Sequence, residues 1–207
     1  MRTRVKICGI TRPEDARDAA TQGADAIGLM FYRPSPRYIS PGRARDIARQ
    51  TPAFVTTVAV FVNPSREEVE EVIRECDIAL LQFHGEEAPE FCASFSRPYV
   101  KVARIRPGLD LIKYLSPYAA AKAWMLDAFH DDLWGGTGGA FDWGVVPNNM
   151  AKPVILSGGL TADNIPDAIR RLRPYAVDVS TGVEISKGVK DAAKIAAFIR
   201  AVKNEDV

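Results

Sequence analysis

Short apolar runs recur along the chain, and each is followed by a turn and a stretch whose apolar positions have helical spacing. The first run covers residues 5–8, and Gly9 interrupts it. Residues 13–23 then carry alanines on one helical face, and Thr11 stands where an N-cap would. This stretch predicts a strand, a tight turn and a helix.

The same order of elements repeats to the end of the chain. The predicted strands cover residues 5–8, 26–31, 57–62, 78–83, 99–104, 123–127, 154–157 and 176–180. The predicted helices cover residues 13–23, 42–50, 86–95, 109–115, 161–172 and 189–201, and two more open at residues 63–65 and 141–143. The pattern therefore predicts eight strand–helix units.

The predicted strands are almost continuously apolar rather than alternating, which is typical of a parallel sheet covered on both faces. Eight such units favour an α/β fold whose sheet closes on itself, a single-domain (βα)8 barrel of the TIM type over residues 1–207. An open, doubly wound sheet is the alternative. That fold more often carries a Gly-x-Gly-x-x-Gly turn after its first strand, where this chain has Gly9 alone.

The composition excludes several classes of protein. A formal net charge of +1 over 207 residues gives no general field for nucleic acid or an anionic membrane. The three cysteines lack C-x-x-C spacing, so they indicate neither a disulfide framework nor a zinc knuckle. No apolar run approaches the roughly 18 residues of a membrane span. We expect a cytoplasmic protein that binds neither nucleic acid nor a membrane.

Two irregular loops have residue types suited to binding. Residues 32–41 are broken by prolines and include Arg37, whose planar guanidinium could pair with a carboxylate or remain a solvated surface charge. Residues 128–140 include the glycine-rich segment 135–139, which is too rich in glycine to be scaffold. We expect the first of these to be a binding loop.

Catalytic groups of a barrel come from the C-terminal ends of its strands. The candidates at these ends are Cys8, His84, Arg104, Asp127, Ser157 and Ser180. Cys8 and Asp127 stand at the ends of strands that are three steps apart around the ring, so their side chains should face each other across its mouth. In that arrangement a base and an acid could act on opposite sides of one substrate. The alternatives are a small buried residue for Cys8 and a capping or salt-bridged carboxylate for Asp127. His84 is left outside the catalytic set, because a histidine hydrogen-bonded within a turn is equally expected.

Small residues follow the seventh and eighth predicted strands, at residues 157–160 and 180–183. Such residues let backbone N–H groups approach an anion, and a barrel binds phosphate at these two loops. Each glycine could also serve only to form a turn. The two loops together predict a phosphate site, and its residues are Gly158, Gly159, Thr181 and Gly182.

Six motifs run through the whole chain: KICGI at 6–10, SPR at 35–37, QFHG at 82–85, GTG at 136–138 with FDW at 141–143, SGGL at 157–160 and DVSTGVE at 178–184. In order and spacing they resemble the phosphoribosylanthranilate isomerase family. Phe83 stands where leucine is usual in that family, and Thr181 where serine is usual. Both substitutions keep the size class or the hydroxyl group.

The resemblance implies an Amadori rearrangement in tryptophan biosynthesis, from N-(5-phosphoribosyl)anthranilate to 1-(2-carboxyphenylamino)-1-deoxyribulose 5-phosphate, with no metal or organic cofactor. It implies Asp127 as the general acid at the furanose ring oxygen and Cys8 as the general base at C2. It further implies that Arg37 holds the anthranilate carboxylate, and that Asp178 and the glycine loops bind the small phosphorylated substrate. The oligomeric state stays open between a monomer and a homodimer.

A thiol base must ionise near neutral pH, so we expect Lys6, backbone donors or substrate binding to lower the pKa of Cys8. Three other functions remain as alternatives. The isomerase of histidine synthesis would use two carboxylates rather than a thiol, and a metal-dependent epimerase would need more histidines than His84 and His130. A non-catalytic phosphosugar-binding barrel would need neither Cys8 nor Asp127.

Overall fold

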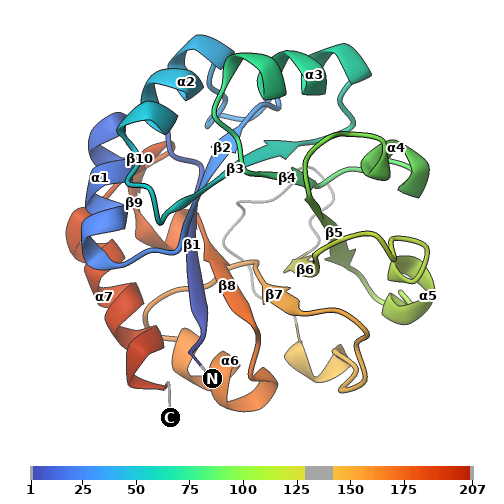
Figure 1. Ribbon diagram of the computed structural model, residues 1–207. Coiled ribbons are helices and arrows are strands. Elements are labelled where there is room, and N and C mark those ends of the chain that lie inside the picture. Colours follow the sequence, from blue (N-terminus) through green and yellow to red (C-terminus); the bar gives the residue numbers. More distant parts are fainter. Residues whose placement is uncertain (1, 129–141, 206–207) are drawn as a thin grey trace.

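Eight parallel strands close into a barrel in the computed structural model, which describes residues 2–128 and 142–205 (Figure 1). The strands are β1 (Arg4–Cys8), β2 (Ala26–Met30), β3 (Thr56–Phe61), β4 (Leu80–Phe83), β5 (Tyr99–Ile105), β6 (Ala123–Ala128), β7 (Val154–Leu156) and β8 (Ala176–Val179). Each pairs with the next along the chain, and β1 also pairs with β8, which closes the ring. The predicted (βα)8 architecture is confirmed.

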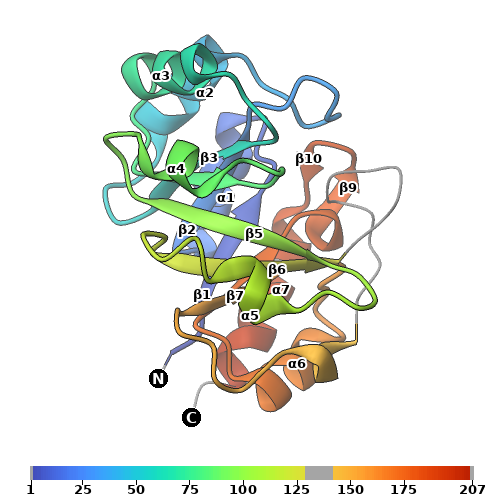
Figure 2. The same cartoon turned by 90° about the vertical axis from the view of Figure 1, so that its right-hand side faces the viewer.

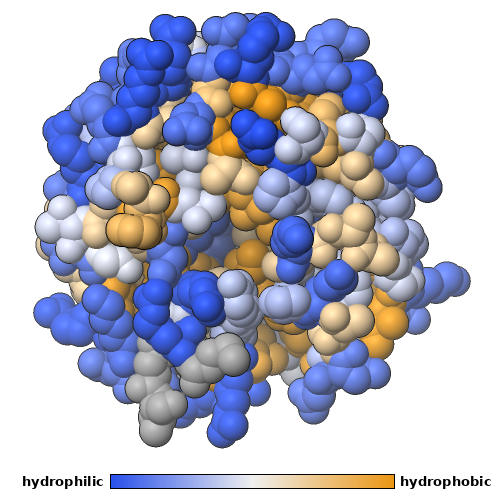
Figure 3. Space-filling view, viewed as in Figure 1, coloured by the Kyte–Doolittle hydropathy of each residue, from blue (hydrophilic) through white to orange (hydrophobic). Residues whose placement is uncertain are grey.

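Helices surround the ring of strands (Figure 1). They are α1 (Pro13–Gln22), α2 (Pro41–Gln50), α3 (Arg66–Glu75), α4 (Pro89–Ala93), α5 (Leu111–Leu115), α6 (Ile165–Leu172) and α7 (Ala192–Asn204). On the face shown in Figure 3, hydrophilic residues dominate the outer rim and hydrophobic residues show toward the middle. No helix in the described ranges is both long enough and apolar enough to cross a membrane.

Apolar side chains pack on both sides of the strands. Val100, Val102 and Met125 belong to a cluster made of strand residues alone, so this cluster fills the inside of the barrel. Ala103 and Leu126 belong instead to the large cluster shared with the helices. Successive residues of a strand point to opposite faces. Burial on both faces explains why the strands form nearly continuous apolar runs in the sequence.

The turn after β1 differs from the prediction. The N-cap of α1 is Arg12, which makes no side-chain capping hydrogen bond, so the assignment of Thr11 as the cap is wrong. The Thr11 hydroxyl donates instead to the carbonyl oxygen of Gly188, which lies in a segment far along the chain. This contact ties the β1–α1 turn to the segment after β8.

That segment is a short hairpin that the sequence pattern did not reveal. It pairs β9 (Glu184–Ser186) with β10 (Val189–Lys190), after the 3-10 turn η2 (Thr181–Val183). The predicted start of the last helix at residue 189 is therefore wrong. Helix α7 begins at Ala192, because the Asp191 side chain accepts hydrogen bonds from the backbone N–H groups of Ala193 and Lys194. Figure 2 shows the hairpin at the opposite end of the molecule from the N-terminus.

The unit after β6 also departs from the prediction. Within the described residues, the segment between β6 and β7 contains the 3-10 turn η1 (Trp143–Val145) where a helix was predicted to open. The glycine-rich segment 135–139 and His130 lie outside the described residues.

A buried ion pair fixes the loop after β4. Lys101 Nζ lies 2.6 Å from Glu87 Oε2 and donates to the carbonyl oxygen of Gly85 at 2.6 Å. Glu87 Oε1 accepts from the backbone N–H groups of Asn63 and Gly85, each at 2.9 Å. The Lys101 side chain is 0% exposed and that of Glu87 is 2% exposed. Neither charge could be left alone at this depth without a large penalty.

We expect Glu87→Gln to lower the free energy of unfolding by about 3 kcal/mol or more, because it leaves the Lys101 charge buried without a counter-ion. Urea unfolding followed by circular dichroism measures the loss. Glu70→Gln is the matched control, since it breaks an exposed pair with Arg66 and should cost under about 1 kcal/mol. Equal losses in the two variants would contradict a special contribution from the buried pair.

Candidate active site

A pocket opens at the C-terminal ends of the strands. Its walls come from the ends of β1, β2, β3, β4, β6, β7 and β8, from the loop of residues 32–37 and from the hairpin of β9 and β10. The polar residues that line it are Cys8, Tyr32, Ser35, Arg37, Gln82, His84, Asp127, Ser157, Asp178, Ser180, Thr181 and Lys187. Among the predicted strand-end residues, Arg104 is the one that does not line it.

Cys8 and Asp127 line this pocket together. Cys8 is the last residue of β1 and Asp127 the penultimate residue of β6. Both side chains are buried, with 7% of Cys8 and 3% of Asp127 exposed. Because β1 and β6 stand three positions apart around the ring, the thiol and the carboxyl approach the pocket from different sides. A substrate between them could meet one proton donor and one proton acceptor.

The thiol of Cys8 lies beside a buried ion pair. Lys6 Nζ is 2.8 Å from Asp178 Oδ1, and both side chains are almost fully buried. Burial, the largest cause, and the Asp178 carboxylate raise the pKa of the Cys8 thiol, and together they outweigh the lowering by Lys6 and Lys190. The expected lowering of this pKa by Lys6 is therefore wrong, because burial and the Asp178 carboxylate outweigh the charge of Lys6.

Lys6 itself stays protonated in this setting. Burial lowers the pKa of Lys6, but the neighbouring Asp178 and Cys8 together raise it further, so the net shift is upward. Lys6 thus holds a permanent positive charge beneath the thiol. The sequence analysis named Lys6 as a possible influence on the thiol, and the structure places its amino group on Asp178, which lines the pocket.

The carboxyl of Asp127 contacts a histidine that was left out of the predicted catalytic set. His84 Nε2 lies 3.0 Å from Asp127 Oδ2, and His84 Nδ1 lies 3.4 Å from Gln82 Nε2. Gln82 lies in β4, and His84 directly follows that strand, two residues further along the chain. The two side chains therefore point to the same face of the sheet. Polar residues at alternate positions of an otherwise apolar strand were the available signal. His84 therefore belongs to the site through its contact with Asp127.

The two glycine loops meet beside this carboxyl. Gly158 and Gly159 have φ angles of +88° and +62°, which side-chain-bearing residues rarely adopt. A Cβ at residue 158 would lie 2.5 Å from the backbone nitrogen of Ala128. Gly158, Gly159 and Thr181 line the pocket, but Gly182 does not. A Cβ at Gly182 would lie 2.1 Å from the carbonyl oxygen of Leu160, so this glycine lets the two loops approach each other.

Arg37 reaches the pocket from the proline-broken loop, and its side chain is held by a carboxylate of the protein. Arg37 Nε and Nη2 each donate to Glu184 at 2.7 Å. The pKa of Arg37 is raised by its hydrogen bond to Glu184. The residue is 7% exposed, so it is not the solvated surface charge that was the alternative.

The described part of the chain offers no cluster of metal ligands. Within residues 2–128 and 142–205, no group of three or more histidine, cysteine, aspartate or glutamate side chains is arranged to hold a metal ion. The described side chains at the pocket are suited to proton transfer and anion binding.

Comparison with characterised sequences places these features in a family. The chain matches the family model described as N-(5'phosphoribosyl)anthranilate (PRA) isomerase over residues 5–201. An N-(5'-phosphoribosyl)anthranilate isomerase of Dechloromonas aromatica is 52% identical over 206 residues, which cover 100% of this chain and 99% of the relative. The enzyme of the same name from Pseudomonas putida strain GB-1 is 55% identical over 200 residues, 97% of each chain.

Solved structures agree with the sequence comparison. Phosphoribosyl anthranilate isomerase from Thermotoga maritima has a TM-score of 0.90 at 38% identity, covering 98% of this chain and 99% of that one. A solved phosphoribosyl anthranilate isomerase in complex with reduced 1-(o-carboxyphenylamino)-1-deoxyribulose 5-phosphate has a TM-score of 0.87 at 38% identity, with the same coverage. The similarity spans nearly the full length, in sequence and in fold, and the chain belongs to the N-(5'-phosphoribosyl)anthranilate isomerase family.

Proposed function

We propose that this chain catalyses the Amadori rearrangement of N-(5'-phosphoribosyl)anthranilate in tryptophan biosynthesis, with Asp127 as general acid and Cys8 as general base. The product is 1-(2-carboxyphenylamino)-1-deoxyribulose 5-phosphate. One observation supports these roles above all. A buried thiol and a buried carboxyl, from strands three steps apart, line one pocket together with the glycine loops.

Ring opening is the first step. Asp127 gives its proton to the furanose ring oxygen, the bond between that oxygen and C1 breaks, and the nitrogen lone pair forms the C=N bond of a protonated Schiff base. His84 contacts the same carboxyl at 3.0 Å and so orients it toward the substrate. Burial of both side chains keeps competing water away from the proton.

Deprotonation at C2 is the second step. The thiolate of Cys8 takes the C2 proton, and the electrons of that C–H bond form a C1=C2 bond while the C=N electrons return to nitrogen. The resulting enolamine relaxes to the ketone. The protonated Schiff base places a positive charge next to C2, which favours ionisation of a neighbouring thiol within the complex.

The remaining pocket residues bind the two ends of the substrate. Gly158, Gly159 and Thr181 provide backbone and hydroxyl donors for the phosphate. Asp178 faces the pocket with its Oδ1 on Lys6, and its other lone pairs accept a hydrogen bond from a sugar hydroxyl. Arg37 holds the anthranilate carboxylate with the N–H groups that Glu184 leaves unused.

Several wider properties belong to the same proposal. The reaction as drawn uses no metal and no organic cofactor, and residues 1–207 act as one catalytic domain. The ligand is a small phosphorylated molecule rather than nucleic acid or a membrane, and the enzyme works in the cytoplasm as a monomer or homodimer. Both states occur for the Thermotoga maritima relative: a solved structure at 36% identity and a TM-score of 0.86 is of monomers generated from the dimeric enzyme.

The two catalytic residues should fail at different steps. We expect Cys8→Ser to lower kcat by roughly 10²–10⁴-fold with KM little changed, because a hydroxyl ionises far less readily than a thiol. Asp127→Asn should slow ring opening by a similar factor, since an amide has no acidic proton to give. The measurement is loss of substrate fluorescence, with N-(5'-phosphoribosyl)anthranilate generated in situ.

Substrate deuterated at C2 separates the two variants. Cys8→Ser should show a large primary isotope effect because proton abstraction limits its rate, whereas Asp127→Asn should show a small one. Near wild-type kcat in Cys8→Ser would rule out the thiol as the base and leave Cys8 as a packing residue.

The pH profile tests the electrostatics of the thiol. Burial raises the pKa of Cys8 and the thiolate is the active form, so kcat/KM should rise with pH through neutrality. Lys6→Met removes a cation that lowers this pKa and leaves the carboxylate of Asp178, which raises it. The acidic limb of the profile should therefore move to higher pH. Lys203→Met, a change at an exposed lysine in the last turn of α7, is the control. A limb unmoved by Lys6→Met would assign the titration to another group.

A further inference from the structure

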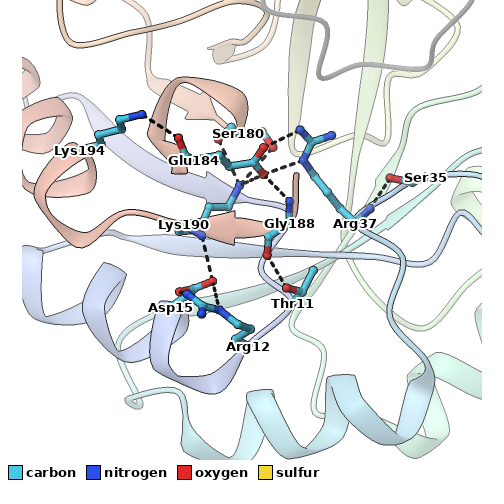
Figure 4. A network of polar contacts seen from close by, with 10 residues as sticks. All are labelled: Thr11, Arg12, Asp15, Ser35, Arg37, Ser180, Glu184, Gly188, Lys190 and Lys194. Atoms are coloured by element: carbon cyan, nitrogen blue, oxygen red, sulfur yellow. Dashed lines mark hydrogen bonds and ion pairs between the residues drawn. The ribbon is translucent and has the colours of Figure 1, made fainter. Parts of the chain in front are cut away.

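Three buried charges form a cluster beside the pocket (Figure 4). Both carboxylate oxygens of Glu184 accept from the Arg37 guanidinium, and Oε1 also accepts from Lys190 Nζ at 2.8 Å. The side chains are 8% exposed for Arg37, 6% for Glu184 and 0% for Lys190. Arg37 lines the pocket, whereas Glu184 and Lys190 stand behind it.

The guanidinium has two edges that can each bind a carboxylate. Its five N–H groups lie in one plane, and Glu184 occupies the edge formed by Nε and Nη2. Among the described residues, the Arg37 side chain has no hydrogen-bond partner other than Glu184. The edge formed by Nη1 and the second N–H of Nη2 can therefore take a carboxylate while Glu184 stays in place.

The carboxylate of Glu184 is itself fixed in position. It sits at the start of β9, and Gly188 of the same hairpin donates its N–H to Oε1 at 3.3 Å. The hairpin is tied to the barrel by Thr11, which donates to Gly188, and by Asp15, which accepts from the Lys190 backbone N–H at 3.1 Å (Figure 4). These contacts make Glu184 a rigid partner rather than a mobile surface side chain.

The path of Arg37 is confined as well. A Cβ at Gly9 would lie 2.5 Å from Arg37 Cδ, so the arginine stem crosses the β1–α1 turn in space that only glycine leaves open. With its stem held over Gly9 and one edge held by Glu184, the guanidinium has little freedom to turn. Its second edge is set in direction before any ligand arrives.

Lys190 decides the charge of the cluster. Arg37 and Glu184 alone would sum to zero and would attract an anion weakly. Lys190 adds one positive charge, which its contact with Glu184 Oε1 at 2.8 Å stabilises. Burial lowers the pKa of Lys190 below its usual value, and Glu184 opposes this shift in part. With Lys190 protonated the cluster carries one net positive charge, which one substrate carboxylate would neutralise.

We propose that Glu184 is a positioning residue for the substrate carboxylate: it aims the free edge of Arg37 into the pocket, and Lys190 restores the positive charge that Glu184 would otherwise cancel. The ligand class is an N-aryl aminosugar phosphate with a carboxylate on the ring. This inference rests on the proposed role of Arg37 in binding that carboxylate.

The test compares two inhibitors that differ in one group. These are reduced 1-(o-carboxyphenylamino)-1-deoxyribulose 5-phosphate and the same compound without its carboxyl group. The inhibition constant of the compound without the carboxyl group, divided by that of the compound with it, measures how much the carboxylate strengthens binding. Glu184→Gln keeps the shape of the side chain but loses the charge and one of the two accepting oxygens, so this ratio should fall about tenfold or more. Lys190→Gln should also lower the ratio, because the cluster loses its net charge.

Two controls accompany these variants. Arg37→Ala should bring the ratio close to one, because the two inhibitors would then bind equally well. Glu87→Gln alters another buried carboxylate paired with a lysine and should leave the ratio at the wild-type value. Circular dichroism confirms that each variant is folded, and Lys190→Gln keeps the test decisive if Glu184→Gln does not fold. If Arg37→Ala leaves the ratio intact, the proposed role of Arg37 fails, and this inference fails with it.

The outcomes separate positioning from other roles of Glu184. If Glu184 only reduced the positive charge of Arg37 and Lys190, Glu184→Gln would strengthen carboxylate binding and raise the ratio. If it only supported the fold, both inhibitors would weaken equally. If Arg37→Ala alone still brings the ratio close to one, either result would overturn the positioning of Arg37 by Glu184. The proposed function would then still stand.

Discussion

The closure of the barrel between β1 and β8 is the constraint on which the site depends. The parallel register across this seam pairs Lys6 with Asp178. Both side chains are buried, and their ion pair at 2.8 Å satisfies charges that neither could hold alone there. Cys8 lies two residues beyond Lys6 and therefore on the same face of β1. The register of one strand pair thus determines which charges surround the thiol.

Buried charges gather at this end of the barrel in small closed groups. The pair of Lys101 and Glu87 shapes the loop that follows His84, and the cluster around Glu184 shapes the approach of Arg37. Replacing such pairs with apolar residues often stabilises a protein, so their presence here asks for a reason other than stability. The cluster around Glu184 holds Arg37, which lines the pocket, whereas the pair of Lys101 and Glu87 holds the turn at Gly85, which does not. The first group fixes the direction of a pocket side chain, and the second fixes a backbone turn beside it.

The sequence was informative where structure depends on local pattern. The apolar runs predicted all eight strands, and strand ends predicted the placement of Cys8 and Asp127. Contacts across the barrel were harder to predict from the sequence, because His84 and Asp127 are 43 residues apart in the chain and meet only once the ring closes. The hairpin of β9 and β10 was missed because strands of three and two residues carry too little pattern. Its Glu184 had been noted only as part of a motif, so its pairing with Arg37 could not be foreseen.

The resting state of Cys8 follows from burial, which no sequence pattern states. A thiol whose pKa is raised stays protonated near neutral pH, and a protonated thiol is a poor nucleophile and reacts slowly with oxidants. In the proposed mechanism Cys8 becomes competent as a base when a positive charge forms beside it. That charge is the protonated Schiff base, which exists only after Asp127 has opened the ring. Under this proposal, the burial that keeps the thiol protonated links its activation to completion of the preceding step.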